Sequence, residues 1–458
     1  MTLRILFAIV PMLCAAAGHA AIHNVRHYGA AADSSAIDSP AFNAAIDAAA
    51  AEGGGTVYVP AGTYLCYSIR LRSNVTLHIE SGATIVAAFP TEHEGYDAPE
   101  PNDNNPYQDF GHSHWHNSLI WAENARNIGI CGGGLIWGAG LTREESRLPG
   151  VGNKAIALRE CTGVSLRDFS MLRCGHFALL ATGVDNMTID NVRVDTNRDG
   201  FDIDCCRNVR ISNCSVNSPW DDAIVLKASY ALGRFRDTEN VTITSCYVSG
   251  FDMGSAHAAT WQTDEPQAPD HGRNCGRIKI GTESSGGFRN IVIANCIFEH
   301  CRGLALEAVD GGTLEDVVVT GITMRHVVNA PLFLRLGSRQ RSPEGTPVGA
   351  MRRISISHVV VSDAESEYAS IISGIPGHCI EEVSLSDITI LYRGGGTADD
   401  ARIVPPENEA VYPEPWMFGR IPASGLYLRH VRGVEMRDVR FRFATPDARP
   451  EVVRHDAL

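Results

Sequence analysis

Short segments in which apolar and polar residues alternate recur along most of the chain. Most of them open with Asn, Asp or Gly and continue with Val, Ile, Leu or Met at every second position. They begin at residues 163, 186, 208, 240, 290, 316, 353 and 382. Because successive side chains of a strand point to opposite faces, this pattern predicts short strands with one face turned toward a core.

The spacing of these strands predicts a solenoid. The closest segments begin 23 residues (163 to 186) and 22 residues (186 to 208) apart, and the wider intervals leave room for loops inserted between coils. Helical heptads do not separate the strands, so leucine-rich and helical repeats fit poorly. One strand cannot bury its apolar face alone, whereas stacked coils can. We therefore expect an all-β parallel β-helix that forms a single domain over residues 21–458.

One segment, Asp38 to Ala51, predicts an amphipathic helix, because apolar residues recur there at helical spacing after Ser39-Pro40. We expect it to cap the open end of the solenoid. Stretches rich in Pro and Gly predict long surface loops of the kind that wall a groove. They are residues 99–106, 260–275, 342–349 and 394–415.

The first twenty residues have the layout of a secretory signal peptide. Arg4 precedes an apolar run from Ile5 to Ala17, and Gly18-His-Ala20 forms a small-residue exit. The mature protein is expected to begin near Ala21 and to be secreted or periplasmic. No other stretch approaches eighteen uninterrupted apolar residues, so we expect no membrane anchor.

The charge disfavours some partners. The formal net charge is -14, and about -15 once Arg4 is removed, which argues against nucleic acid or an anionic membrane as a partner. A negative net charge also disfavours a polyanionic substrate.

Thirteen cysteines in an exported chain suggest disulfides, and their pairing stays open. Cys214, Cys246 and Cys296, however, occupy the same place in three similar segments. They are better explained as a stacked interior row.

Clustered aspartates are the strongest candidates for chemistry. Asp199 and Asp221 are 22 residues apart, one local coil, so a β-helix would stack them on neighbouring rungs about 4.8 Å apart. Asp222 can reach the same groove only if the chain bends, which Pro219 favours. Hydrolysis of a glycosidic bond needs one protonated and one ionised carboxyl group, and packed like charges supply the protonated one. Aspartates that cap turns or bind calcium between coils would give the same spacing.

The same residues carry a resemblance to a known family. Asn197-Arg-Asp199-Gly resembles the Asn-Thr-Asp-Gly motif of the polygalacturonases, glycoside hydrolase family 28, and Asp221-Asp222 before Ala-Ile-Val-Leu-Lys is similar to its Asp-Asp segment. The resemblance runs from about Ala31 to Gly312. It implies a right-handed β-helix and an inverting mechanism, with Asp221 as general acid and Asp199 and Asp222 holding the attacking water.

Two family motifs are absent. Asn274 and Cys275 stand where the family has Gly-His, and His271 just upstream is a candidate substitute or a solvated loop residue. Ala305 and Glu307 stand where the family's Arg-Ile-Lys holds a uronate carboxylate. A carboxylate there would repel galacturonate. We therefore expect specificity altered from plain polygalacturonate, toward a neutral or mixed glycan of the pectin type or a related polysaccharide or oligosaccharide.

Further residues are candidates for substrate binding. Glu283 and Glu307 could join the aspartates as catalytic or sugar-binding groups, or form salt-bridged groove walls. Lys279 could pair with a charged ring or be a solvated outer-face residue, and Trp220 suits stacking on a sugar ring or plain packing. Arg277 and Lys227 are other possible partners of a charged ring. His112, His114 and His116 alternate as a metal-binding trio could, or wall a sugar site. We expect no metal, no cofactor and a monomer.

Two other functions stay open. A β-helix can also house a polysaccharide lyase or a uronate epimerase, which calcium dependence or an unsaturated product would reveal. It can also be a glycan-binding protein without catalysis, which would bind without turnover.

Overall fold

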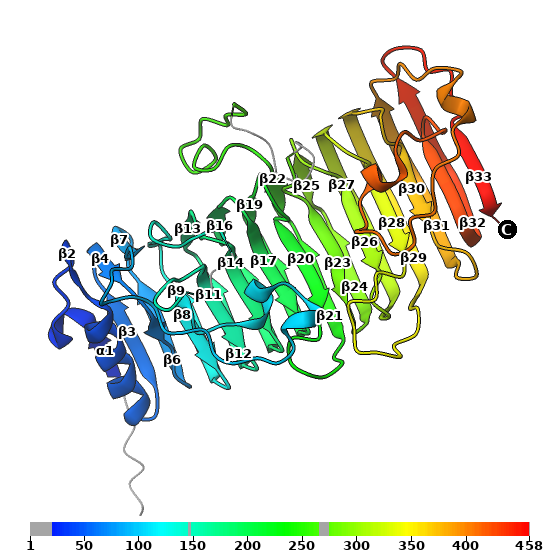
Figure 1. The fold of residues 1–458 in the computed structure, drawn as a ribbon. Coiled ribbons are helices and arrows are strands. Elements are labelled where there is room, and N and C mark those ends of the chain that lie inside the picture. The colour runs from blue at the N-terminus through cyan, green and yellow to red at the C-terminus, as the bar shows by residue number, and fades with distance from the viewer. Residues whose placement is uncertain (1–20, 145–147, 265–273, 458) are drawn as a thin grey trace, which may run out of the picture.

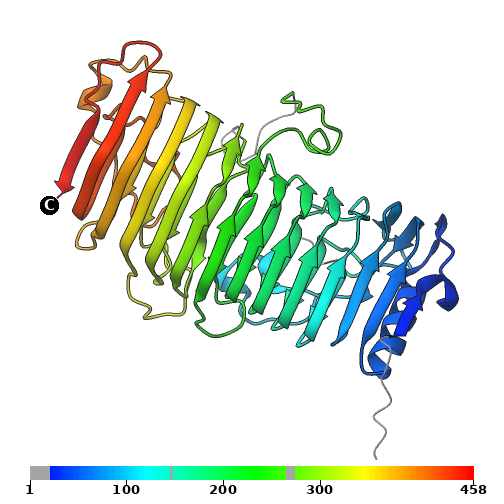
Figure 2. The ribbon, with the colours of Figure 1, turned by 180° about the vertical axis from the view of Figure 1, so that it is seen from behind.

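A computed structural model describes residues 21–144, 148–264 and 274–457, and it is an elongated solenoid (Figure 1). The 33 strands of these described residues pair in parallel from coil to coil. The same order of coils is visible from behind, from the N-terminal to the C-terminal end (Figure 2). The predicted parallel β-helix is thus confirmed. The predicted cap is confirmed as well: helix α1 (Ser39–Ala51) packs Phe42, Ala45 and Ile46 against the first coils.

Three stacks of strands form the walls. The first stack, which carries the candidate site, consists of β5 (Ile69–Arg70), β8 (Ser118–Glu123), β11 (Lys154–Arg159), β14 (Phe177–Thr182), β17 (Asp199–Asp204), β20 (Ile224–Ala228), β23 (Ile278–Ser284), β26 (Leu304–Ala308), β28 (Leu332–Leu336), β30 (Ser370–Ser373), the start of β32 (Leu426–Phe443) and β33 (Val452–Ala457).

The second stack consists of β1 (Ala21–Asn24), β3 (Gly55–Val59), β6 (Val75–Ile79), β9 (Arg126–Cys131), β12 (Thr162–Arg167), β15 (Asp185–Asp190), β18 (Arg207–Ser212), β21 (Thr238–Thr244), β24 (Phe288–Ala294), β27 (Thr313–Val327), β29 (Ala350–Ala364) and β31 (Ile380–Tyr392). The third consists of β2 (Asp33–Ile37), β4 (Gly62–Cys66), β7 (Ala83–Ala87), β10 (Leu135–Trp137), β13 (Ser170–Leu172), β16 (Arg193–Asp195), β19 (Ser215–Asn217), β22 (Tyr247–Ser249) and β25 (Ile297–Glu299). The short 3-10 helices are η1 (Val25–Tyr28), η2 (Asn105–Tyr107), η3 (Phe110–Ser113), η4 (Asp400–Arg402) and η5 (Pro415–Phe418).

The repeats stack in register. Met187, Val209, Val241 and Ile291 lie opposite one another in β15, β18, β21 and β24, and all are buried. Cys214, Cys246 and Cys296 are buried as predicted, and every cysteine in the described residues is free. The interior is therefore held by apolar rows rather than by disulfides.

The recurrent Asn that opens a segment has two roles. Asn186, Asn208, Asn240 and Asn290 all have positive φ, between 53° and 58°, where Asn is better tolerated than most residues. Their side-chain amides also bond along the solenoid: Asn208 donates to Asn186 at 3.1 Å, and Asn290 donates to Asn240 at 2.7 Å. This ladder fixes the turn between the first and second stacks in each coil.

No helix among the described residues is long and apolar enough to cross a membrane.

Candidate functional site

The predicted aspartates lie together on the first stack. Asp199 begins β17, while Asp221 and Asp222 lie in the bend between β19 and β20, so both can face one groove as the sequence required. The register differs from the prediction by one residue. Phe201 pairs with Ile224, and Gly200 N donates to Asp222 O at 3.0 Å, so Asp222 rather than Asp221 lies opposite Asp199. The bend after Pro219 adds one residue to this coil, which the 22-residue spacing did not reveal.

Asp222 is the ionised member of the group. Its side chain is buried, and Oδ1 accepts from Arg277 Nε at 2.8 Å and from Cys275 Sγ at 3.1 Å. Lys279 Nζ lies 3.3 Å from Oδ2. Burial alone would raise the pKa of Asp222, but Lys279 and Arg277 hold that pKa well below its usual range.

Asp199 has the opposite tendency. It is buried, and its Oδ1 has no hydrogen-bond partner among the described residues. Burial, and then the charge of Asp221, raise the pKa of Asp199 well above its usual value. Asp221 is the most accessible of the three, with 28% of its side chain exposed, and its Oδ2 lies 3.0 Å from Arg198 Nη2. One coil therefore offers a carboxylic acid and the next a carboxylate.

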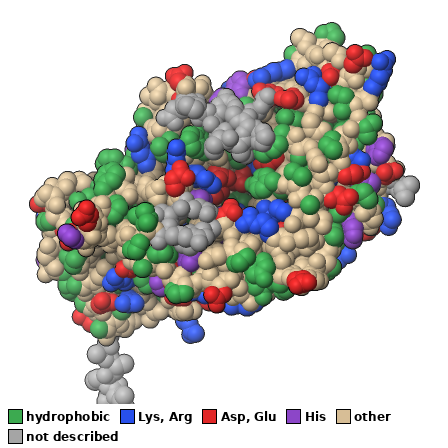
Figure 3. All heavy atoms as spheres, viewed as in Figure 1, with side chains coloured by type: hydrophobic (Ala, Val, Ile, Leu, Met, Phe, Trp, Pro, Cys, Tyr) green, Lys and Arg blue, Asp and Glu red, His purple; other side chains and the backbone are tan. Residues whose placement is uncertain are grey.

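A cavity of about 390 Å³ opens beside these residues. It is lined by Arg198, Trp220, Asp221, Asp222, Cys275, Arg277, Lys279, Arg302, Tyr412, Glu414 and Trp416. Acidic side chains gather in the hollow at the middle of this face, with basic side chains beside them (Figure 3). Aromatic rings together with polar and charged groups are the composition of a site for a sugar-sized ligand.

The C-terminal loop supplies part of this cavity. Residues 394–415 were predicted to wall a groove, and the segment with Tyr412, Glu414 and Trp416 does so from the connection between β31 and β32. These three residues and Arg302 were not among the candidates predicted from the sequence. The available signal was the aromatic and acidic residues that precede or follow Pro in Tyr412-Pro-Glu414-Pro-Trp416, because a residue before proline tends to be extended.

The predicted binding residues fall into two groups. Trp220 and Lys279 line the cavity. Glu307 lies behind Lys279, with Oε2 3.5 Å from Nζ, and burial raises the pKa of Glu307 to about 7 even though Lys279 and Arg277 oppose that rise.

Glu283 lies 3.6 Å from Lys227 Nζ. Burial favours its neutral form, but Lys227, His112, Arg339 and Arg341 hold the pKa of Glu283 well below its usual range. His271 lies outside the described residues.

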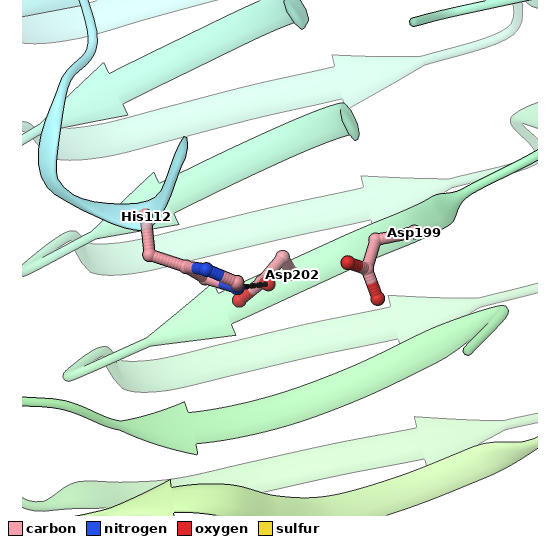
Figure 4. Close-up of side chains that lie close together, drawn as sticks. All are labelled: His112, Asp199 and Asp202. Carbon is pink, nitrogen blue, oxygen red and sulfur yellow. Dashed lines mark hydrogen bonds and ion pairs between the residues drawn. The ribbon is translucent and has the colours of Figure 1, made fainter. Parts of the chain in front are cut away.

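A second charged cluster lies beside Asp199. His112 from η3 points at Asp202, with Nε2 3.0 Å from Oδ2, and Asp199 lies close to both (Figure 4). Lys227 contacts His112 and places Nζ 2.7 Å from Asp202. The ammonium thus takes the position that a bound cation would need.

The histidine trio does not converge. His114 bonds Glu100 O at 2.6 Å and Asn105, while His116 Nε2 lies 3.0 Å from Glu123. The three rings therefore serve three separate contacts, and the arrangement does not support a metal site built from them. Asp221, Asp222 and Cys275 also bring ligand atoms within 4.8 Å of one another, but Arg277 and Lys279 already neutralise that group.

Known proteins share this fold and part of the sequence. A family model described as rhamnogalacturonase A/epimerase, pectate lyase-like, matches residues 22–135, and a right-handed β-helix model matches residues 113–264 and 156–330. A probable polygalacturonase of Vitis vinifera is 22% identical over 404 residues, 79% of this chain and 73% of that protein. This chain is a right-handed parallel β-helix protein that is distantly similar to polygalacturonases.

Solved structures agree on the fold of this polygalacturonase-like chain. The family 28 exopolygalacturonase of Yersinia enterocolitica superposes with a TM-score of 0.66 at 17% identity, covering 96% of this chain and 78% of that one. PfbA, a surface adhesin of Streptococcus pneumoniae, gives 0.60 at 15% identity, covering 93% and 91%. A mannuronan C5-epimerase of Azotobacter vinelandii is 48% identical over only 65 residues, 14% of this chain and 4% of that protein. The fold and the right-handed coil are thus shared by enzymes and by an adhesin.

Proposed function

We propose that this polygalacturonase-like protein is a secreted or periplasmic glycoside hydrolase that cleaves a pectin-type or related polysaccharide or oligosaccharide. The observation that carries the proposal is the contrast between Asp199 and Asp222 beside an aromatic-lined cavity. Two carboxyl groups whose surroundings drive their pKa values apart can supply an acid and a base at one pH. That is what cleavage of a glycosidic bond requires.

We assign the proton donor to Asp221, because it is the accessible member and lines the cavity. Asp199 lies opposite Asp222 on the neighbouring coil, and burial raises its pKa well above the usual value. In the proposed reaction Asp221 delivers a proton to the leaving oxygen, while Asp222 takes one from the attacking water. Asp222 stays ionised and activates water.

The reaction is proposed to invert the anomeric carbon. The nearest ligand atoms of Asp221 and Asp222 are within 4.8 Å, which is shorter than the roughly 6.5–9.5 Å between carboxyl groups that is typical of inverting pairs. Distance alone therefore favours the retaining class. Asp222 is nevertheless poorly placed as a nucleophile, because both of its oxygens are engaged by Arg277, Cys275 and Lys279. It is better suited to orient a water than to attack carbon.

Proton NMR of the first product decides the stereochemistry. A product whose anomeric configuration is opposite to that of the substrate supports the assignment of Asp222 as a base. Retention would instead make one of these carboxylates a nucleophile.

The substrate is the first thing to test. Mature protein should be incubated with homogalacturonan, rhamnogalacturonan fragments and neutral plant glycans, while reducing ends and ultraviolet absorbance are followed together. We expect new reducing ends without absorbance. Absorbance from an unsaturated product would favour the lyase alternative, for which the short epimerase match is a reason to look. Binding without product would favour the non-catalytic alternative that the fold shared with an adhesin keeps open.

A further inference from the structure

Glu414 occupies the centre of a cationic pair inside the cavity. Arg277 grips it in a forked arrangement, with Nη1 3.2 Å from Oε2 and Nη2 in contact with Oε1. Arg302 Nη1 lies 3.0 Å from the same Oε1. All three side chains are almost wholly buried, and all three line the cavity.

This geometry is that of carboxylate recognition. Two guanidinium groups that converge on one carboxylate, one of them through two parallel bonds, form the strongest arrangement that side chains offer to such a group. Arg277 and Arg302 come from consecutive coils, whereas Glu414 arrives from the loop more than one hundred residues later in the chain. The rigid solenoid thus supplies the receptor, and the loop supplies the carboxylate.

We propose that Arg277 and Arg302 form a carboxylate-binding subsite that Glu414 permanently fills, so that the substrate unit bound there is a neutral sugar. This inference rests on the proposed function in that the cavity is taken to receive a sugar. It names the class of sugar, and it makes Glu414 the residue that determines specificity.

The charge balance of the cavity supports this. The basic side chains that line it are Arg198, Arg277, Lys279 and Arg302, and each has a carboxylate partner within the protein. A uronate would have to displace Glu414 or pair with cations that are already neutralised, and it would lie close to the displaced carboxylate. A neutral ring meets no such repulsion and can stack on Trp220, Tyr412 or Trp416.

The position of Glu414 is also unlike that of an ordinary surface ion pair. Removing one partner of a buried ion pair leaves an uncompensated charge. Without the Glu414 carboxylate, Arg277 and Arg302 should therefore bind an external anion. An external carboxylate of the right size can bind between the two guanidinium groups once the Glu414 side chain has been removed.

The test is to titrate D-galacturonate and D-galactose separately into wild-type protein and into the Glu414→Ala variant, following heat release and the thermal midpoint. We expect the variant to bind galacturonate at least about tenfold more tightly than galactose, and more weakly as salt is raised. The wild type should show no such preference. Acetate should partly restore the midpoint of the variant.

Glu407→Ala is the matched control. Glu407 belongs to the same loop and pairs with the buried Arg429 and with His430, but it does not line the cavity. This variant should lose stability without gaining affinity for galacturonate. If Glu414→Ala does not fold, Glu414→Ser leaves the same space open and offers a hydroxyl group near the two guanidinium groups, and it should still gain a salt-sensitive affinity for galacturonate that the wild type lacks.

Two outcomes would overturn the inference: a folded Glu414 variant that shows no preference for galacturonate, or a wild type that binds galacturonate as tightly as the variant does. Both readouts are binding measurements, so they stand apart from cleavage. A wild type that cleaves no glycan would defeat the proposed function while a gain in the variant still upheld the subsite. Efficient cleavage of homogalacturonan that the Glu414 substitution leaves unchanged would uphold the function and defeat the subsite.

Discussion

Arg198 holds Asp221 by an ion pair, with Nη2 3.0 Å from Oδ2. It stands where the polygalacturonase motif has a threonine, so this guanidinium is a departure placed directly beside the proposed proton donor. Burial works against its charge, but Asp221 and Asp199 together raise the pKa of Arg198, which therefore remains a cation.

Arg198→Thr should move the alkaline limb of the pH–rate profile to higher pH. Without the guanidinium, the proposed proton donor loses a neighbouring positive charge, and such a loss favours the protonated form of a carboxyl group. Turnover at the optimum should fall by about tenfold, because Asp221 loses the contact that orients it. Arg234→Thr, which removes an exposed pair with Glu160, is the control and should leave the profile unchanged. An unmoved alkaline limb in Arg198→Thr would argue that Asp221 does not deliver the catalytic proton.

Asp199→Asn and Asp222→Asn should differ sharply in stability. Since the pKa of Asp199 is raised, its neutral form is favoured in the fold, and an amide replaces it at a change within about 1 kcal/mol. Asp222 balances Arg277 and Lys279 in a buried site, so its loss should destabilise the protein by about 3–5 kcal/mol. Urea midpoints of the two variants at neutral pH measure the difference. Equal losses would mean that both groups are ionised in the native protein.

Glu307 should make the protein less stable as pH rises. Its pKa rises from an ordinary value of 4.5 to about 7 on folding, so the contribution is complete below pH 4.5 and is lost as pH passes 7. Because one pKa unit corresponds to about 1.4 kcal/mol, this shift changes the free energy of unfolding by about 3 kcal/mol. Thermal midpoints across this range should fall for the wild type and stay flatter for Glu307→Gln. Glu283→Gln should behave in the opposite sense, because the lowered pKa of Glu283 contributes stability that is lost as pH falls.

Two substitutions of Asn208 measure the cost of the left-handed backbone conformation in the asparagine ladder. Asn208 has φ of 57° and bonds with Asn186 and Asn240. Asn208→Gly loses those bonds but tolerates the backbone, whereas Asn208→Ala loses the bonds and must also adopt a left-handed conformation, at about 1–2 kcal/mol. The alanine variant should therefore unfold at lower urea than the glycine variant. The reverse order would mean that the greater flexibility of glycine in the unfolded chain costs more than the left-handed conformation costs alanine.

The sequence predicts this fold well because the fold is local and repeated. Each segment such as Asn186-Met-Thr-Ile repeats the same turn, the same inward apolar pair and nearly the same length. Equivalent positions of consecutive repeats are therefore predicted to stack on each other. Asp199, Asp221 and Asp222 could be brought together on that basis alone. The one-residue error in their register comes from the bend after Pro219, where the coil is not regular.

The positions of the other residues of the site could not be predicted from the repeat pattern. Glu414 lies 137 residues from Arg277 and belongs to a loop whose path no periodic pattern encodes. Its partner Arg302 lies just outside the strand that the family motif singles out. Glu307 was a candidate for sugar binding or for a salt bridge, and it is buried beside Lys279, because a strand position fixes a side chain's face and not what covers it.

The most direct test of the proposed chemistry is the rate of reducing-end release by Asp221→Asn on the glycan that the wild type cleaves, with Asp103→Asn in an exposed loop as the control. We predict that Asp221→Asn lowers the rate by about 10²–10⁴-fold while glycan binding persists, and that the control keeps the wild-type rate. A rate for Asp221→Asn within a few-fold of the wild type would contradict the assignment of Asp221 as the proton donor and with it the proposed active site.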